Sequence, residues 1–443
     1  MAACVATGLL LTACASYQPL PLSERAPGGM TVEAGSLPFP ALAAHRFDPD
    51  DGLDIVEVAM LAVVNNPDLR VARSDAAVAH AQAFAAGLLP DPQLALSGDL
   101  NNNAGPSASK AYSLGLSYDV TSLLTHPALH RAADREAEKV DLTLLWQEWQ
   151  VVSQAQLLFV KLSEGRRIQA VLTATRDLYA DRLSRMRAAL AQGLLNSDAV
   201  TPNLVALQDV ERQLFDNGKL LNQAAHDLNA LLGLAPDTVL ALQDGGEPGM
   251  PDAALVQSAL DALPQRRPDL RALQSAFAAQ DQRYRAAILA QFPALSLGFT
   301  HARDNSFVVS NGVGINLSLP FFNRNRGNVA IEQATRQKLL DDYQARVQAA
   351  RNDVHRILQE QALNTAQLDR VEHDLVELKQ QLARSDSALR TGNADVLLYV
   401  SARSALLAKE MERISLQQAV LEQRIGLRTL LGIDMTRLES TTP

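Results

Sequence analysis

Two histidines one helical turn apart are the first residues whose spacing could support chemistry. His126 and His130 stand four positions apart, and on one helix face this spacing lets two imidazoles bind a divalent metal. Pro127 lies between them, and the residues just before them alternate as a strand does. A rigid helical face is therefore not expected here, and we predict no metal site.

Several carboxylates follow, and two of them could act as general acid and base if they formed an isolated pair. They are instead mixed with Arg and Lys along one helical stretch, which is typical of a solvated face. These carboxylates are Glu136, Glu138, Asp141 and Glu148. Gly312 and Gly314 lie in a strand pattern without the Lys and following helix of a phosphate-binding loop. We predict that the chain is not an enzyme or a motor and needs no cofactor.

Both cysteines, Cys4 and Cys14, lie at the N-terminus, so no disulfide framework is expected in the body of the chain. The apolar run from Val5 to Leu11 is too short to span a membrane and is typical of a signal peptide. Leu11-Thr12-Ala13-Cys14 resembles a bacterial lipobox, which implies lipidation of Cys14, with palmitate among the acyl groups. No Lys or Arg precedes the apolar run, which leaves the true start open, and an ordinary apolar N-terminus is the alternative.

The composition limits the fold class and the partners. The 443 residues include 40 Lys and Arg against 49 Asp and Glu, without a basic stripe that could bind phosphate backbones. Nucleic acid is therefore not an expected partner. Aromatic residues make up only 5% while helix-forming residues are plentiful, so we expect a mostly helical protein. No later run is long and apolar enough for a membrane helix, so any membrane span should be made of strands.

The chain contains an internal duplication. Pro67-Asp68-Leu69-Arg70 returns 201 residues later as Pro268-Asp269-Leu270-Arg271. Gly193 and the Leu231-Leu232-Gly233 motif return 199 residues later, as Gly392 and Leu430-Leu431-Gly432. Two copies of one structural unit are therefore predicted. The expected divisions are a lipoprotein signal segment (1–13), an extended tether (14–52), repeat 1 (53–233), a linker (234–252), repeat 2 (253–433) and a C-terminal tail (434–443).

Both copies show the same order of patterns. In the first, a helix over 67–89 is followed by alternation within 94–119, which predicts a β-hairpin with one apolar face. A helix over 130–191, about 90 Å long, then leads to a reversal at Gly193 and a shorter returning helix, which indicates a coiled coil. The corresponding segments of the second copy are 268–291, the strands near 295 and 313–319, 327–390 and the stretch after Gly392.

The hairpins raise the question of how their sheet is completed. Four strands cannot close a barrel, and a bilayer does not tolerate open sheet edges, whose amides would lack hydrogen-bond partners. Three chains would supply twelve strands, enough for a β-barrel with a polar lumen. We therefore expect a mainly α fold with a small β part, in which a homotrimeric twelve-stranded β-barrel continues into a barrel of helices. The residues expected to face the lumen are Ser113, Gly115, Ser117, Asn316 and Ser318. Hairpins capping a coiled-coil rod without a pore are the alternative.

The repeated helix starts, the reversal glycines and the Leu-Leu-Gly ends resemble the TolC-type outer-membrane factor (outer membrane efflux protein) family. The strand end from Leu317 to Asn328 adds to the resemblance, which covers about residues 50–433. It implies an outer-membrane duct that extends into the periplasm, where it meets a membrane-fusion adaptor and an inner-membrane pump, with the RND type expected. The segments Leu88 to Pro92 and Pro320 to Gly327 look most like the cation-efflux, CzcC-like branch.

Family members commonly narrow the periplasmic tip with acidic side chains after the second turn glycine, and that pattern is incomplete here. Leu398 and Ser401 stand where carboxylates are common, and the nearby acid is Asp395. We expect Asp198 and Asp395 to cap the returning helices. The residues predicted to form the tip gate or adaptor-docking site are Gly193, Asn196, Asp198, Gly392, Asp395 and Ser401.

The function expected from these patterns is passive export from the periplasm to the exterior, driven by the inner-membrane pump. The branch resemblance favours heavy-metal cations as the exported substrate. A drug-efflux duct and a type I secretion duct are alternatives within the same fold. A coiled-coil lipoprotein that bridges the envelope without a pore is the alternative from another class.

Overall fold

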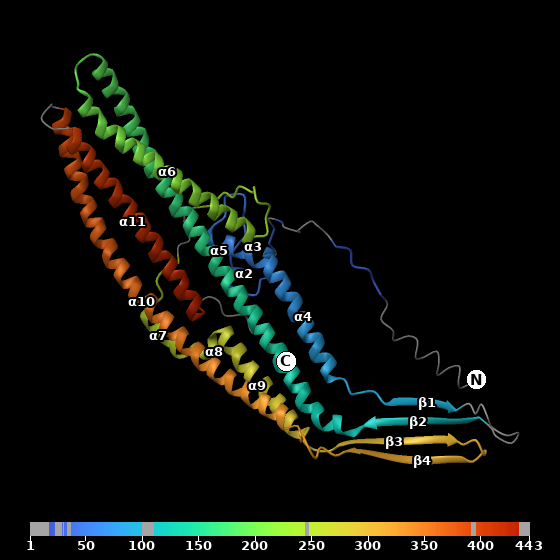
Figure 1. The fold of residues 1–443 in the computed structure, drawn as a ribbon. Coiled ribbons are helices and arrows are strands. Elements are labelled where there is room, and N and C mark those ends of the chain that lie inside the picture. Colours follow the sequence, from blue (N-terminus) through green and yellow to red (C-terminus); the bar gives the residue numbers. More distant parts are fainter. Residues whose placement is uncertain are drawn as a thin grey trace.

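The chain forms an elongated, mostly helical molecule with a small sheet at one end and two helical hairpins at the other (Figure 1). The computed structural model describes residues 17–22, 29, 31–32, 37–99, 110–243, 248–390 and 396–433. Among these residues, no helix is both long enough and apolar enough to cross a membrane.

The two copies have the same order of long elements, as the duplication predicts. Helix α2 (Pro40–Ala43) lies within the segment expected to be an extended tether, whose residues Phe39 and Leu42 are instead buried beside Trp149 of the body. The first copy contains α3 (Ile55–Asn65), α4 (Pro67–Gly87), β1 (Gln93–Asp99), β2 (Ala111–Asp119), α5 (Val120–Ala191) and α6 (Ser197–Leu231). The second contains α7 (Ala253–Asp261), α8 (Leu263–Arg266), α9 (Pro268–Leu289), β3 (Ala294–Arg303), β4 (Val309–Ser318), α10 (Arg326–Arg390) and α11 (Val396–Leu431). The short helices α2, α3, α7 and α8 were not among the expected elements.

Helix α5 is longer than the sequence pattern suggested. It begins at Val120, directly after β2, because the Asp119 side chain accepts a hydrogen bond from the Thr121 amide at 2.9 Å. Pro127 lies inside the helix, so its interpretation as a break between strand and helix was wrong. At 1.5 Å per residue, the 72 residues of α5 extend about 110 Å.

In each copy, hydrogen bonds join the start of the helix that precedes the β-hairpin (α4 or α9) to the end of the returning helix (α6 or α11). In the first copy, the Asn66 side chain caps α4 and donates to the Leu231 carbonyl at 2.9 Å. In the second, the Arg266 guanidinium donates to the carbonyls of Leu431 and Gly432 at 3.2 and 3.0 Å. The two ends of each copy therefore meet near the middle of the molecule (Figure 1).

The Leu-Leu-Gly motifs end the returning helices as predicted. Gly233 and Gly432 have φ angles of 62° and 66°, the left-handed conformation that favours glycine after a helix. A Cβ atom on Gly432 would lie 2.6 Å from the Trp149 ring of α5, so this glycine also permits a close approach between the two copies.

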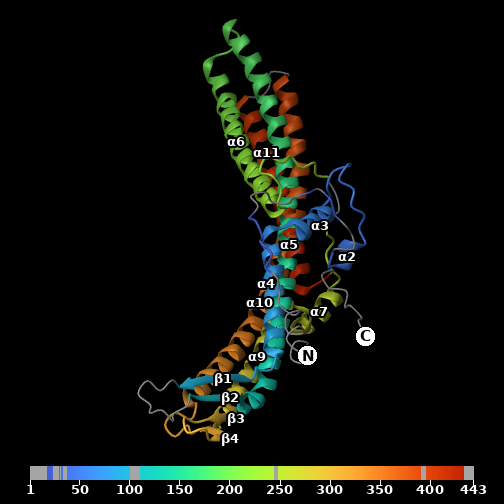
Figure 2. The ribbon, with the colours of Figure 1, turned by 90° about the vertical axis from the view of Figure 1, so that its right-hand side faces the viewer.

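The helices of the two copies pack side by side. Helix α5 packs along α6, α9 and α11, and α10 packs along α11 (Figure 2). A buried apolar cluster in the middle of the molecule joins Val58 of α3, Phe159 of α5 and Ile425 of α11. Another near the hairpin ends joins Leu183 of α5, Leu207 of α6 and Leu407 of α11. The core therefore runs along the helices rather than filling a compact centre.

Candidate functional site

The four strands form one antiparallel sheet in the order β1-β2-β3-β4, so the two hairpins lie edge to edge. The register pairs Leu116 with both Leu94 and Phe299, and Phe299 with Val313. Because side chains alternate between faces, this row and its equivalents two residues away share one face. Most of that face is apolar: it carries Leu94, Leu96, Tyr112, Leu114, Leu116, Tyr118, Leu295, Leu297, Phe299, Val309, Val313, Ile315 and Leu317, with Gly98, His301, Arg303 and Asn311 toward one end. We call it the apolar face.

The opposite face, which we call the polar face, carries only small or polar residues. It consists of Gln93, Ala95, Ser97, Asp99, Ala111, Ser113, Gly115, Ser117, Asp119, Ala294, Ser296, Gly298, Thr300, Ala302, Ser310, Gly312, Gly314, Asn316 and Ser318. All five residues expected to face a lumen are therefore brought together on one surface. Such a face can line a hydrated passage, because it offers hydroxyl and amide groups to water and leaves space for it.

Exposed aromatic and aliphatic side chains gather where the sheet meets the helices. Phe321 and Phe322, in the turn between β4 and α10, are 69% and 96% exposed, and Phe292 before β3 is 61% exposed. Asn325 in the same turn donates a hydrogen bond to the Ala287 carbonyl of α9 at 2.8 Å, which anchors the turn. Aromatic side chains at this level are typical of a membrane–water boundary.

At the opposite end of the molecule, the first helical hairpin turns at Gly193, as predicted. Gly193 has a φ angle of 73°, and its amide donates to the Leu190 carbonyl at 2.9 Å. The cap of α6 is Asn196, whose side chain accepts from the Ala199 amide at 3.1 Å. The assignment of the cap to Asp198 was wrong, since Asp198 lies in the first turn, where its charge favours the helix N-terminus. Gly392 and Asp395 lie outside the described residues.

Near this tip, α5 and α11 make contacts that sequence patterns did not indicate. The Tyr179 hydroxyl lies 3.2 Å from the Ser404 hydroxyl, and the Arg182 guanidinium stacks on the Tyr399 ring. Burial raises the pKa of Tyr179, which keeps the phenol protonated. Ser401, the remaining predicted tip residue, is exposed on the same helix. The spacing of residues along the chain could not indicate these contacts, because Tyr179 and Ser404 are 225 residues apart.

The histidine pair lies on a continuous helix, contrary to the expectation of a broken one. The rings of His126 and His130 are 6.1 Å apart, and His126 Nε2 lies 3.2 Å from the Gly87 carbonyl oxygen. His130 lies 3.7 Å from Asp134. Within the described residues, no group of three or more His, Cys, Asp or Glu is arranged to hold a metal.

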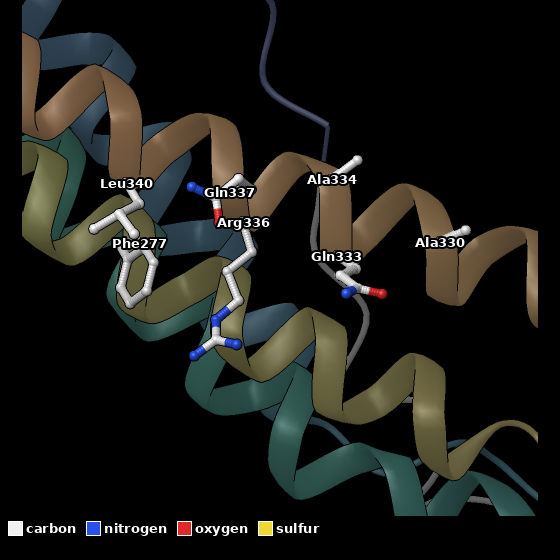
Figure 3. Close-up of a pocket in the computed structure, with 7 residues that line it drawn as sticks. All are labelled: Phe277, Ala330, Gln333, Ala334, Arg336, Gln337 and Leu340. Carbon is white, nitrogen blue, oxygen red and sulfur yellow. The ribbon is translucent and has the colours of Figure 1, made fainter.

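A shallow groove of about 520 Å³ runs between α9 and α10. Phe277 comes from α9, and Arg336 and Leu340 come from α10 (Figure 3). Arg336 already lies 3.1 Å from the Asp281 carboxylate of α9. With amides and apolar side chains as the other lining groups, the groove suits packing by another side chain rather than acid–base chemistry.

A buried charge cluster holds the start of α9 against α5. Arg267, 2% exposed, binds the Asp269 carboxylate through two nitrogens at 2.9 and 2.7 Å and stacks on Trp146 of α5. Arg346 of α10 binds the same carboxylate at 2.8 Å. Burial alone would raise the pKa of Asp269, but hydrogen bonds from both arginines outweigh it and lower this pKa. The repeated Pro-Asp-Leu-Arg motif thus supplies an anchor in the second copy.

Solved outer-membrane channels share this fold and its four-stranded sheet beside long helices. CusC, solved during study of its transmembrane channel formation, is 21% identical and matches with a TM-score of 0.74 over 89% of this chain and 97% of its own. The CmeC channel of Campylobacter jejuni is 15% identical, with a TM-score of 0.74 over 96% of each chain. The MtrE channel of Neisseria gonorrhoeae is 17% identical, with a TM-score of 0.72 over 87% of this chain and 91% of its own. At these identities the likeness establishes the fold.

Residues 259–433, nearly the whole second copy, match the family described as outer membrane efflux protein. A search of curated proteins gives no match. The family match covers about two-fifths of the chain and agrees with the resemblance drawn from its sequence. The matched family and the MtrE channel are both described as outer-membrane proteins.

Proposed function

We propose that three copies of this chain form the exit duct of a tripartite efflux machine, which carries its substrate passively from the periplasm to the exterior. The observation that carries this proposal is the sheet, whose polar face holds no large apolar side chain on any of its four strands. A closed barrel of twelve strands would turn this face toward a hydrated lumen and the apolar face toward lipid.

The two edges of the sheet support closure by neighbouring copies. Strands β1 and β4 are the outer strands, and α4 leads into β1 while α10 follows β4. Pairing β1 of one copy with β4 of the next would satisfy the edge amides and place α4 beside α10. Phe84 of α4 is 71% exposed and suits the groove between α9 and α10 of the neighbouring copy.

The dimensions of the sheet suit an outer membrane. The ten residues of β3 extend about 33 Å, and the 35–45° tilt of barrel strands reduces the height of the sheet to a band of roughly 25 Å. Phe322 would lie at the periplasmic boundary of the band, and Tyr112 would lie near the other boundary.

The proposed protein partners bind at the end of the helical hairpins, which lies opposite the sheet. A membrane-fusion adaptor would dock on the periplasmic tip around Gly193, Asn196, Asp198 and Ser401, and an inner-membrane pump, expected to be of the RND type, would supply the energy. Gly392 and Asp395 stay predicted members of this tip. A lipid on Cys14 would add an anchor to the membrane.

For the substrate, the resemblance of Leu88 to Pro92 and Pro320 to Gly327 to the CzcC-like branch favours heavy-metal cations. Drug efflux and type I secretion use the same kind of duct, and upstream pumps do most of the selection in a wide passive lumen. Zinc, cobalt or copper sensitivity of a deletion strain, compared with its sensitivity to dyes and detergents, distinguishes these substrates.

Two measurements on detergent-purified protein test the duct itself. Flotation with liposomes should place the protein in the bilayer fraction, and single-channel recording should give steady, cation-favouring conductance. Asp395→Ala should change that conductance if the carboxylate stands at the constriction. A trimer that stays soluble without detergent and does not float with liposomes would instead support the envelope-bridging lipoprotein.

A further inference from the structure

A polar cluster interrupts the apolar face of the sheet near the end that is farthest from the helices. His301 of β3 pairs with Asn311 of β4, and their side chains are joined at 2.7 Å between Nδ1 and Oδ1. The Tyr112 hydroxyl of β2 lies 3.5 Å from Nε2 of His301. In the same row, β1 and β2 carry Leu96 and Leu114. The polar groups are therefore confined mainly to the second hairpin.

The register places this cluster at a definite height. The row Leu94–Leu116–Phe299–Val313 is apolar on all four strands. One row further, about 7 Å along the strands, stand His301 and Asn311, and the next row pairs Arg303 with Tyr112. Hydrogen-bonding side chains are costly in hydrocarbon, so these rows mark the level at which an apolar environment ends.

Arg303 is the cation of this cluster and has no anionic partner in the described part of the chain. Its guanidinium stacks 4.6 Å from the centre of the Phe307 ring, and it forms no ion pair with a carboxylate of the described residues. Its Nε atom is buried and makes no hydrogen bond with the described residues. The adjacent carboxylate, Asp304, accepts hydrogen bonds from the amides of Ser306 and Val308 and so holds the turn.

A second cation stands on the neighbouring strand. Lys110 is exposed and directly precedes β2, whose residue Tyr112 pairs with Arg303. The alternation of β2 gives Lys110 the same parity as Tyr112, so it belongs to the same face. Two cations and a histidine thus border the apolar face at one end. Arg binds phosphate through two parallel hydrogen bonds, and Lys binds it as a point charge.

We propose that Arg303 and Lys110 bind the phosphate of a lipid headgroup in the outer leaflet, with His301, Tyr112 and Phe307 packing at the boundary. This inference rests on the proposed function, because it requires the apolar face to lie in a bilayer. A membrane surface rich in phosphate attracts basic side chains at this depth. The ligand is therefore a phosphorylated lipid, whose acyl chains cover the rows below the cluster.

The test compares two lipids bound to the intact detergent-solubilised protein by native mass spectrometry: phosphatidic acid, which carries a phosphomonoester, and phosphatidylcholine. The wild-type protein should prefer phosphatidic acid about tenfold, as expected for charge-assisted hydrogen bonds. Arg303→Gln should reduce the preference to near unity, and Lys110→Gln should reduce it in part. Arg351→Gln, which removes an exposed charge on α10, should retain it.

Three outcomes would overturn the inference. These are equal binding of the two lipids by the wild-type protein, a preference that Arg303→Gln leaves intact, and equal loss in Arg351→Gln. Displacement of the bound lipid by millimolar inorganic phosphate would assign the cluster to a free anion instead. Flotation separates the two proposals, because a protein that enters liposomes without a phosphatidic acid preference refutes only the headgroup site. Failure to enter liposomes refutes the proposed function.

Discussion

The guanidinium carbon of Arg182 lies 3.9 Å from the centre of the Tyr399 ring. This cation–π contact joins α5 of the first copy to α11 of the second, about three helical turns before Gly193 ends the first hairpin. Such contacts contribute about 0.5–2 kcal/mol, depending on their exposure to water. The pair therefore links the two hairpins near the end at which adaptor docking is proposed.

Tyr399→Leu should loosen the tip and favour its open state, because it removes the ring while keeping an apolar side chain. The loss of about 0.5–2 kcal/mol corresponds to a shift in open population of roughly twofold to thirtyfold. Single-channel recording measures this shift. Phe215→Leu is the matched control, since Lys219 stacks on Phe215 within α6 alone. Equal effects of the two changes would refute a linking role for Tyr399.

Asp269→Asn should lower the stability of the helical body. It leaves the guanidinium of Arg267 buried without its carboxylate, a change that typically costs about 3–5 kcal/mol. Thermal unfolding followed by circular dichroism at pH 7 measures the loss. Glu360→Gln is the control, because its partner Arg356 is 58% exposed and the pair contributes little. Similar midpoints for both variants would contradict the role given to the buried cluster.

The same carboxylate predicts a pH dependence. The two arginines hold the pKa of Asp269 below its ordinary value, so its stabilising contribution is fully present above an unfolded pKa of about 4. That contribution is lost as the pH falls through the lowered folded pKa. The midpoint difference between wild type and Asp269→Asn should therefore shrink as the pH falls below about 4. A difference that stays constant over this range would argue against the ionised pair.

Gly432→Ala and Gly193→Ala distinguish two reasons for a glycine: a positive φ angle and the close approach of a neighbouring side chain. Both glycines have positive φ angles, 66° and 73°, so alanine should cost about 1–2 kcal/mol at each. At Gly432 the new Cβ would also lie 2.6 Å from the Trp149 ring, whereas nothing lies within 4 Å at Gly193. Overpacking should add about 1–3 kcal/mol to the loss at Gly432. Equal unfolding midpoints would show that the Trp149 contact relaxes freely.

The two faces of the sheet predict a pattern of chemical access. In protein reconstituted into liposomes, Ser117→Cys on the polar face should react with a charged thiol reagent, and Leu116→Cys on the apolar face should be protected by lipid. Labelling is counted above that of the unsubstituted chain, which contains Cys4 and Cys14. Faster labelling of Leu116→Cys than of Ser117→Cys would reverse the assignment of the faces.

Much of the fold could be predicted because the duplication imposes consistency. Each signal for a helix boundary occurs twice, which makes it more informative than a single occurrence. Helices start at Pro67 and at Pro268, and helices end before Gly233 and before Gly432. The strand alternation likewise placed Ser113 and Asn316 on one face, since a period of two is a local property. These features depend on residues close together in the chain.

The errors arose where several local choices were nearly equal. Asn196 and Asp198 are both good helix caps, and only the backbone path selects Asn196. Pro127 suggested a break, yet a proline in the first turns of a long helix removes only one of many backbone hydrogen bonds. The contacts of Arg267 with Trp146 and of Arg182 with Tyr399 join distant segments, so no spacing rule could reveal them.

The hydrogen bonds from Asn66 to the Leu231 carbonyl and from Arg266 to the Leu431 carbonyl suggest how the duplicated chain arose. Because each copy begins and ends at the same level, a chain containing a single copy would need no long connection to reach its neighbour. Each such chain would bring one hairpin, so six would be needed for the twelve strands of the proposed barrel. A gene fusion would then convert a hexameric ring into a trimer without moving a strand, and each half would be free to specialise, as Arg303 of the second β-hairpin illustrates.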